Sequence, residues 1–509
     1  MLMIESLRVD SETCQLKKIP AMLILISFLM ITPSIVSAHS DYALSDSQFI
    51  ISDEGLLNPE PYVWQEINGF CAWAATAIAM EYAGVDLSLY DVFAATTVGF
   101  SFAYFNVNDT MLMLPGALYT QAEPTDYLAE LYGVDYTLYI DSDIPNLEQN
   151  LQVWESEGLT VSTLDGESDA FDLMRETINS GYPLLISVDP SWLPSPDYDI
   201  LREEGLTGGG HGIVLVGYND TTATATYIDP GVGSFGDNFG YPVDGRGNYT
   251  VITYSALNTA WSNRYYISNT FIPSGQTPPA PDDSLGPLIR DKLLGVGTIY
   301  SPNSANAYLG SFGEKAFRAM STDMTAEGLK SFLSVFDGID NEIQFKASVI
   351  LFIGLGLESQ VTLQYLSYRT ALQALPSIMT ETDLTDFVAA GEQALPYFEE
   401  ITDNSTLIYP GNLTKATGFV ATTFKAIADS YNASGNIDAA FSPYTAELND
   451  ISAALLGIAD SWQAAGNELA KIWPNDFISQ YGTIIAFGIG GVIAIVVIFF
   501  WWSSKKPSQ

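Results

Sequence analysis

Cysteine, histidine and positive charge are all scarce in this sequence. Its 509 residues include two cysteines and two histidines, and 19 Lys plus Arg face 60 Asp plus Glu, for a formal net charge of −41. So negative a chain repels nucleic-acid phosphates and anionic headgroups, which argues against a nucleic-acid partner. The same charge favours solubility and association with cations.

The scarcity of thiols and imidazoles limits the chemistry open to the chain. Cys14 precedes the apolar core of an export signal, so the exported chain keeps Cys71 alone. A single cysteine has no disulfide partner within its own chain, so stability must come from core burial. Together with the one interior histidine, His211, it is too little for a Cys/His zinc centre. We therefore predict neither a metal nor a cofactor.

The first 38 residues have the pattern of a secretory signal. Two lysines precede an apolar run over residues 21–31, and small residues suited to cleavage end at Ala38. An uncleaved anchor helix is the alternative, but Pro33 and the shortness of the run favour cleavage. We predict a signal peptide over 1–38 and an exported mature chain.

A second apolar segment, residues 484–502, contains no charge. About 20 apolar residues cross a bilayer as a helix. Two tryptophans end this segment and two lysines follow, which is typical of a cytoplasmic membrane boundary. A removable lipid-anchor signal is the alternative, but such tails normally lack a basic stop. We predict a single-pass cell-membrane protein with a transmembrane helix over 484–502, a cytoplasmic tail over 503–509 and an extracytoplasmic ectodomain.

Residues 272–287 (IPSGQTPPAPDDSLGP) divide the ectodomain into two parts of different character. This stretch is rich in Pro, Gly and Asp and lacks periodicity, so it predicts a semi-rigid linker between domains over 39–271 and 288–475. On an exported chain, Asn-x-Ser/Thr sequons are candidate glycosylation sites. They occur at Asn108, Asn219, Asn248, Asn404, Asn412 and Asn432.

The first part mixes helices and strands, which predicts the α+β class. Residues 71–83 are Ala-rich and end at Gly84, as expected of a helix. Further along, the patterns predict a helix over 168–179, a strand over 183–188, and a hairpin of strands 213–216 and 223–228 joined by Asn219-Asp220.

The second part is predicted to be an all-α helical bundle. Apolar residues recur at three-four spacing in three stretches. These are Leu329, Phe332, Leu333 and Phe336, then Leu384, Phe387, Val388 and Gly391, then Leu448, Ile451, Leu455, Ile458 and Trp462 after a Ser442-Pro443 cap. The apolar stretch 347–357 is too short to cross a membrane and predicts a buried core helix.

Four residues have the types and order that a thiol hydrolase needs. Cys71 begins a helix, where free N–H groups and the helix dipole favour a thiolate. Gln65 lies six residues earlier and can join the Cys71 N–H as an oxyanion donor. His211, between glycines before a strand, is the candidate base, and Asp229, which ends the next strand, can orient the imidazole. Alone, the cysteine would be read as a small buried side chain and His211 and Asp229 as turn residues, and Gln65 by itself carries almost no information.

In this order the residues resemble the papain-like cysteine peptidase superfamily, and they are most similar to the bacteriocin-processing, double-glycine peptidase-like domains. Those domains have a Gln, a Cys opening a helix that ends in Tyr-x-Gly, a later Gly-His before an apolar strand, and an Asp-Pro. The counterparts here are Gln65, Cys71, Tyr82-Ala83-Gly84, Gly210-His211 and Asp229-Pro230. The resemblance covers roughly residues 60–271 and implies a helix packed on an antiparallel sheet.

The resemblance implies a peptidase, and the sequence departs from the family in two respects. Ala72 and Trp73 follow Cys71, where the family usually has glycine or another small residue. No ATP-binding cassette is attached, so transport-coupled leader removal is not implied. We predict a membrane-anchored extracytoplasmic cysteine peptidase acting on peptide or protein substrates. The alternatives are a non-catalytic surface peptide-binding or adhesion protein, and a thiol amidase or transpeptidase.

Overall fold

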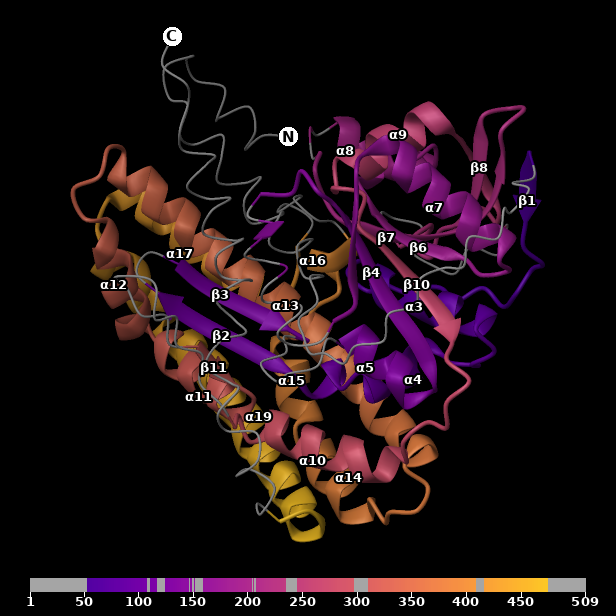
Figure 1. Cartoon of the computed structure of the whole chain (residues 1–509). Helices are drawn as coiled ribbons and strands as arrows, with labels where there is room; N and C mark the ends of the chain where they lie inside the picture. Colours follow the sequence, from indigo (N-terminus) through magenta and orange to yellow (C-terminus); the bar gives the residue numbers. More distant parts are fainter. Residues whose placement is uncertain are drawn as a thin grey trace.

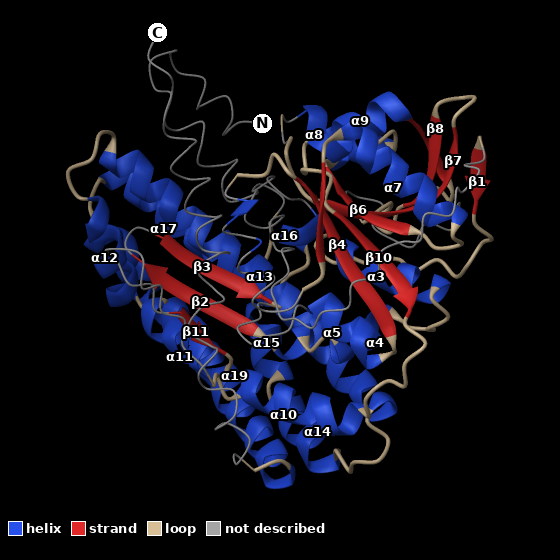
Figure 2. Ribbon diagram, in the orientation of Figure 1, coloured by secondary structure: helices blue, strands red, loops and turns tan. Residues whose placement is uncertain are grey.

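A computed structural model describes residues 53–474, except 108–109, 117–123, 146, 149–150, 152–158, 204, 206, 235–244, 297–309 and 409–415. The predicted signal peptide, anchor helix and cytoplasmic tail lie outside the described residues, as do Asn108 and Asn412 of the sequons. In Figure 1 a sheet with its helices occupies one side of the molecule and a mainly helical part occupies the other. The predicted α+β class is confirmed (Figure 2).

An eight-stranded sheet organises the first part of the described chain. Its order is β5-β4-β10-β6-β7-β8-β9, with β1 pairing with β7, and only the β4–β5 pair is parallel. The strands are β1 (Glu54–Leu56), β4 (Val134–Asp141), β5 (Val161–Leu164), β6 (Leu184–Val188), β7 (His211–Asn219), β8 (Thr224–Ile228), β9 (Thr250–Thr253) and β10 (Ser268–Pro273). The predicted hairpin is therefore confirmed as β7–β8.

Strand β7 is buried on both faces because helices cover both sides of it. Successive strand residues point to opposite faces. Val214 and Val216 accordingly join the core under α3 (Cys71–Tyr82), whereas Ile213 and Leu215 join the core with α7 (Glu167–Asn179) and α9 (Tyr254–Ser262). The α3 residues against the sheet are mostly alanines, which let the helix approach closely. A Cβ on Gly212 of β7 would lie 3.2 Å from the Cα of Ala72.

Helices make up most of the second part. They are α10 (Pro281–Leu293), α11 (Glu314–Asp323), α12 (Ala326–Leu333), α13 (Glu342–Ile378), α14 (Thr385–Glu392), α15 (Leu395–Ile401), α16 (Ser405–Ile408), α17 (Phe419–Ser434), α18 (Ile437–Phe441) and α19 (Thr445–Ile472), with 3₁₀ turns η5 (Ser334–Phe336) and η6 (Ser442–Tyr444). The predicted seam of α19 is confirmed, because all five of its apolar residues are buried. Ser442 is not a side-chain cap, because it lies inside η6.

The segment predicted as a linker is only partly extended. Strand β10 runs to Pro273, and α10 already begins at Pro281. A proline is well tolerated in the first turn of a helix, and the acidic residues Asp282 and Asp283 there complement the helix dipole. The Pro-Asp cluster that suggested a linker is thus partly a helix start.

The helical part is not an all-α unit standing apart, which corrects the prediction. It includes a three-stranded sheet, ordered β11-β2-β3, in which β2 (Phe102–Val107) and β3 (Thr110–Pro115) come from the first part of the chain and β11 (Gly310–Phe312) from the second. The neighbouring helix α4 (Leu89–Ala95) and turn η2 (Val98–Phe100) pack on α13. A further helix, α5 (Pro124–Leu131), packs on β4.

Aromatic contacts make one core of the two parts. Phe102 of β2 stacks on Phe317 of α11 with ring centroids 4.6 Å apart. Phe100 meets the ring of Tyr368 of α13 edge-on at 5.8 Å. Residues from both parts belong to the same buried apolar cluster. The boundary that the sequence predicts between them is therefore not a boundary between separate cores.

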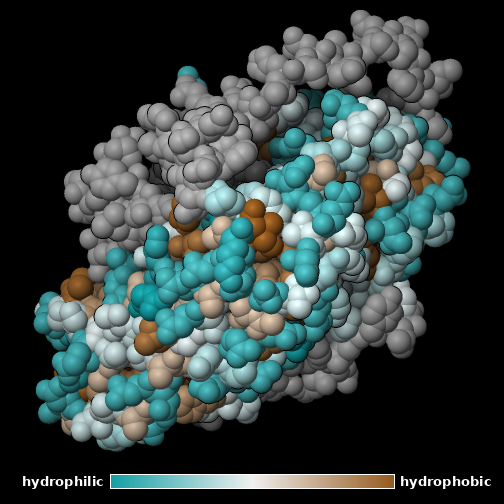
Figure 3. Space-filling view, turned by 90° about the horizontal axis from the view of Figure 1, so that it is seen from below, coloured by the Kyte–Doolittle hydropathy of each residue, from teal (hydrophilic) through white to brown (hydrophobic). Residues whose placement is uncertain are grey.

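Helix α13 is the one described helix long and apolar enough to cross a membrane, but 67% of its most apolar window is buried inside the protein. This is the environment of a core helix, as predicted for residues 347–357. The outer surface is different. On the face seen in Figure 3 hydrophilic residues predominate and apolar residues form small separate groups.

Glu358 is a buried carboxylate in the middle of α13. Its Oε2 accepts the backbone N–H of Ala421 at 2.9 Å, in the first turn of α17, where Gly418 supplies no side-chain cap. Burial raises the pKa of Glu358 to about 7, Asp403 adds to the increase, and the N–H donors of α17 oppose it. The folded state therefore holds this proton more tightly than the unfolded chain does.

The free energy of unfolding of the wild-type protein should consequently fall as the pH rises from the ordinary glutamate pKa to about 7. Glu358→Gln removes the charge and keeps an acceptor for the Ala421 N–H. We expect the free energy of unfolding of the variant, relative to that of the wild type, to increase by about 1–3 kcal/mol between about pH 5 and pH 8. Thermal unfolding at the two pH values measures this gain, with the exposed Glu327→Gln as control. An equal pH response in wild type and Glu358→Gln would contradict the assignment.

Candidate active site

Cys71 is the first residue of α3 and lies beside the start of strand β7. Gly69, two residues earlier, adopts φ +109°, a region that favours glycine, and a Cβ there would lie 2.9 Å from Leu363 of α13. Cys71 is 6% exposed. Burial by itself raises the pKa of its thiol, but the charge of His211, a hydrogen bond with it, and the N–H groups of Gly212 and Ala72 lower that pKa on balance.

His211 opens β7 and pairs across the sheet with Val188 of β6. Its Nε2 lies 2.8 Å from Oδ1 of Asp229. Burial lowers the pKa of the imidazole, but the charges of Asp229 and Cys71 outweigh it and raise that pKa to about 10. Since Nε2 faces Asp229, Nδ1 is the ring nitrogen available to the sulfur. The arrangement favours a thiolate and an imidazolium side by side at neutral pH.

Asp229 directly follows β8, the neighbour of β7, and is fully buried. Besides the imidazole, its Oδ1 accepts the N–H of Gly231 at 2.8 Å. A Cβ on Gly231 would come within 2.6 Å of both the His211 ring and the Tyr198 hydroxyl, so glycine is needed there. The Asp-Pro pair that the sequence marks as a strand end thus also places a carboxylate against the imidazole.

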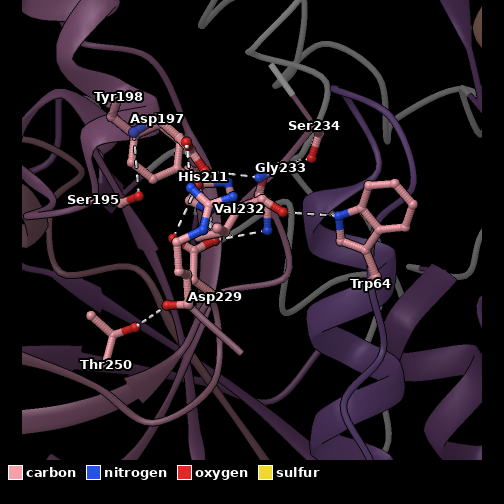
Figure 4. Close-up of polar contacts among 12 residues, drawn as sticks. Trp64, Ser195, Asp197, Tyr198, His211, Asp229, Val232, Gly233, Ser234 and Thr250 are labelled. Atoms are coloured by element: carbon pink, nitrogen blue, oxygen red, sulfur yellow. Dashed lines mark hydrogen bonds and ion pairs between the residues drawn. The ribbon is translucent and has the colours of Figure 1, made fainter. Parts of the chain in front are cut away.

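Gln65 lies in the segment that runs alongside the turn after β8. Its N–H donates to the carbonyl of Pro230 at 3.0 Å, and the indole of Trp64 donates to Val232 at 3.0 Å (Figure 4). The side chain is 1% exposed, and its Oε1 has no hydrogen-bond partner in the described part of the protein. The structure therefore brings Gln65 into the neighbourhood of the other three residues. Its role as an oxyanion donor stays a prediction.

Tyr198 completes the cluster, and sequence reasoning missed it. Its hydroxyl lies 3.0 Å from both carboxylate oxygens of Asp229 and 3.1 Å from Nε2 of His211. It belongs to the segment before His211, which folds as η3 (Pro190–Trp192), η4 (Pro196–Tyr198) and α8 (Asp199–Glu203). Nothing in the spacing of this Pro- and Gly-rich stretch singles out one tyrosine.

A surface hollow of about 420 Å³ lies elsewhere, between α7 and α9. It is lined by Glu167, Ser168, Phe171, Arg175 and Tyr254. Its cation is already engaged, because Arg175 pairs with Asp172 and Asp220. None of the four predicted site residues lines this hollow.

Comparison with known proteins agrees with this geometry. Residues 57–257 match the Peptidase_C39 like family, and all four predicted site residues fall within the match. No curated protein matches the chain. This stretch of the chain is a papain-like, C39 peptidase-like domain, which confirms the resemblance drawn from the sequence.

Proposed function

We propose that the chain is a cysteine peptidase that hydrolyses peptide bonds through Cys71, His211 and Asp229. One observation carries the proposal: three residues from α3, β7 and the end of β8 meet, with the imidazole bonded to Asp229 at 2.8 Å and the pKa of the thiol lowered by that imidazole. The match to the Peptidase_C39 like family supports the same reaction class.

The reaction follows from the positions of these groups. The Cys71 thiolate attacks the peptide carbonyl, forming a carbon–sulfur bond and an oxyanion. The Cys71 N–H and the Gln65 amide are the proposed donors to that oxyanion, and such a donor contributes roughly 10²–10³ in rate. The His211 imidazolium gives its proton to the leaving amine as the carbon–nitrogen bond breaks. Water, deprotonated by the same imidazole, then releases the acid and regenerates the thiolate.

The location of the reaction is part of the proposal. A signal peptide over 1–38 would export the chain, and a helix over 484–502 would hold it at the membrane with the peptidase part outside. Exported proteins often form disulfides, but a mature chain with one cysteine has no partner for an internal disulfide. The thiol of Cys71 would therefore stay available for the reaction outside the membrane. Peptides or proteins outside the membrane are then the substrates.

Peptide cleavage by the full chain tests the proposal. Wild-type protein in detergent is incubated with a mixed peptide library, and products are identified by mass spectrometry. We expect new termini with wild type and none with Cys71→Ala, whereas Cys14→Ala, which alters the only other thiol, keeps full activity. Cleavage that survives Cys71→Ala, or its absence from wild type, contradicts the proposal. Products extended by an added amine would indicate a transpeptidase instead.

A further inference from the structure

The Tyr198 hydroxyl lies at the junction of imidazole and carboxylate. It is within hydrogen-bond distance of three atoms, namely both oxygens of Asp229 and Nε2 of His211. The tyrosine is completely buried, and its ring lies 5.5 Å from the imidazole ring, centroid to centroid. Figure 4 shows this side chain with its hydroxyl directed at the pair.

Counting protons assigns the role of each group. An ionised carboxylate only accepts hydrogen bonds, so Nε2 of His211 must carry the hydrogen that it shares with Asp229. The hydroxyl has one proton, and that proton goes to the carboxylate. Its oxygen then faces the Nε2 hydrogen as a second acceptor. This pattern fixes the tautomer and leaves Nδ1 as the base for Cys71.

One oxygen of the Asp229 carboxylate depends on the Tyr198 hydroxyl for its hydrogen bond. Oδ1 receives hydrogen bonds from His211 and Gly231. Tyr198 is the donor that the described structure gives to Oδ2. Because Asp229 is fully buried, loss of the hydroxyl would leave that oxygen without a described partner.

The segment that carries Tyr198 is braced against the site at several points. Asp197 accepts the N–H of Gly233 at 2.9 Å and pairs with Arg246 at 3.0 Å, which fixes the turn after Asp229 (Figure 4). At the base of the segment, Asp189 accepts the N–H of Gly208 at 2.7 Å and thereby joins its two ends. The tyrosine is therefore held in place by its own loop.

We propose that Tyr198 is a positioning residue whose hydroxyl holds the Asp229 carboxylate in place against the imidazole and His211 in the Nε2–H form, and so sets the pH above which Cys71 is a thiolate. The consequence for catalysis rests on the peptidase function proposed above. The four groups form a chain of contacts, which we call the relay. The Tyr198 hydroxyl stabilises the Asp229 carboxylate, the carboxylate stabilises the His211 imidazolium, and the imidazolium stabilises the Cys71 thiolate.

The titratable groups around the relay come from every element packed on it. Cys71 lies on α3, His211 on β7, Tyr227 on β8, and Asp197 precedes Tyr198 in η4. Asp197 is already paired with Arg246. Tyr227 is fully buried two residues before Asp229, and its hydroxyl has no hydrogen-bond partner in the described part of the chain. It therefore offers a matched control.

The test follows the rate of Cys71 alkylation by iodoacetamide against pH in the full chain with Cys14→Ser and His39→Ala. We expect Tyr198→Phe to move the acid limb of the profile upward by about one pH unit, so that alkylation near pH 6 slows about tenfold. Tyr227→Phe should leave the profile unchanged. Coincident profiles for wild type and Tyr198→Phe, or an equal shift in Tyr227→Phe, overturn the proposal.

A second measurement does not depend on the variant folding. With His39 replaced, His211 is the only histidine in the chain, so its ring nitrogens can be followed by ¹⁵N NMR in otherwise wild-type protein. Above the imidazolium range, the proposal requires hydrogen on Nε2 and a bare Nδ1, and the reverse tautomer overturns it. Neither readout needs a substrate, so failure to cleave peptides would count against the proposed function and leave this result readable.

Discussion

Replacing His211 by alanine is expected to lower peptide cleavage by about 10²–10⁴ and to suppress alkylation of Cys71 at neutral pH. Two effects combine in this variant. The proposed general acid for the leaving amine is lost, and the thiol loses the charge that lowers its pKa. Burial of Cys71 then acts unopposed by the imidazole and raises that pKa. Steady-state cleavage and iodoacetamide labelling at fixed pH measure the two effects separately.

The only other histidine provides the control for this prediction. His39 lies at the predicted cleavage junction, outside the described residues, so His39→Ala should retain wild-type rates. Asp229→Asn keeps the shape of the carboxylate without its charge and should fall between His211→Ala and wild type. Unchanged cleavage in His211→Ala would mean that the imidazole is not the acid–base group.

Truncation of the chain after Gly275 is expected to abolish cooperative folding, even though it keeps the whole stretch that matches the Peptidase_C39 like family. The cut removes the partners of side chains that belong to the peptidase-like part. Phe100 would lose Tyr368, and Phe102 would lose Phe317. Burying one such side chain contributes about 1.5–3 kcal/mol, and a domain has only about 5–15 kcal/mol in total.

Polar contacts across the same interface would also be lost. The Gln364 side chain of α13 donates to the carbonyl of Gly99 at 2.6 Å and accepts the N–H of Gly116 at 3.2 Å. Gly99 has no room for a Cβ, which would lie 2.4 Å from that of Ala371. The interface is therefore closely packed, and its loss would expose buried polar groups as well as aromatic rings.

Calorimetry and dye binding distinguish the outcomes of truncation. The chain ended at Gly275 should bind a hydrophobic dye and show no sharp unfolding transition. A chain ended after Pro474 keeps every described residue, and it should unfold cooperatively like the full chain. A sharp transition in the shorter chain would mean that the peptidase-like part folds without the helices.

The closeness of Cys71, His211 and Asp229 could be predicted from the sequence because its signals are local, while their catalytic roles stay predictions. A helix beginning at Cys71, a glycine-flanked His211 before a strand and a strand ending at Asp229 each place one residue at an element boundary. The order of these elements then determines that the boundaries meet. Tyr198 escaped prediction because its position depends on how an irregular segment folds onto the turn after β8, and hydrophobic periodicity does not predict the path of an irregular segment.

The division into two domains was predicted less well, for a related reason. Composition along the chain changes near residue 272, and the Pro-rich stretch there suggests a linker. The structure instead adds β11 to strands β2 and β3 from the first part and packs α4 on α13. These pairings join residues more than 200 positions apart, a separation over which hydrophobic periodicity carries no information.

A titration of the Cys71 thiolate by its ultraviolet absorbance is the most direct test of the central claim that thiol and imidazole form an ion pair. The difference between wild type and Cys71→Ala isolates this one group, and His211→Ala shows the thiol without its partner. We predict that the wild-type thiolate forms well below about pH 8.5, the ordinary cysteine pKa, and that it forms above that value in His211→Ala. A wild-type thiolate that appears only at or above about pH 8.5, unaffected by His211→Ala, would contradict the account.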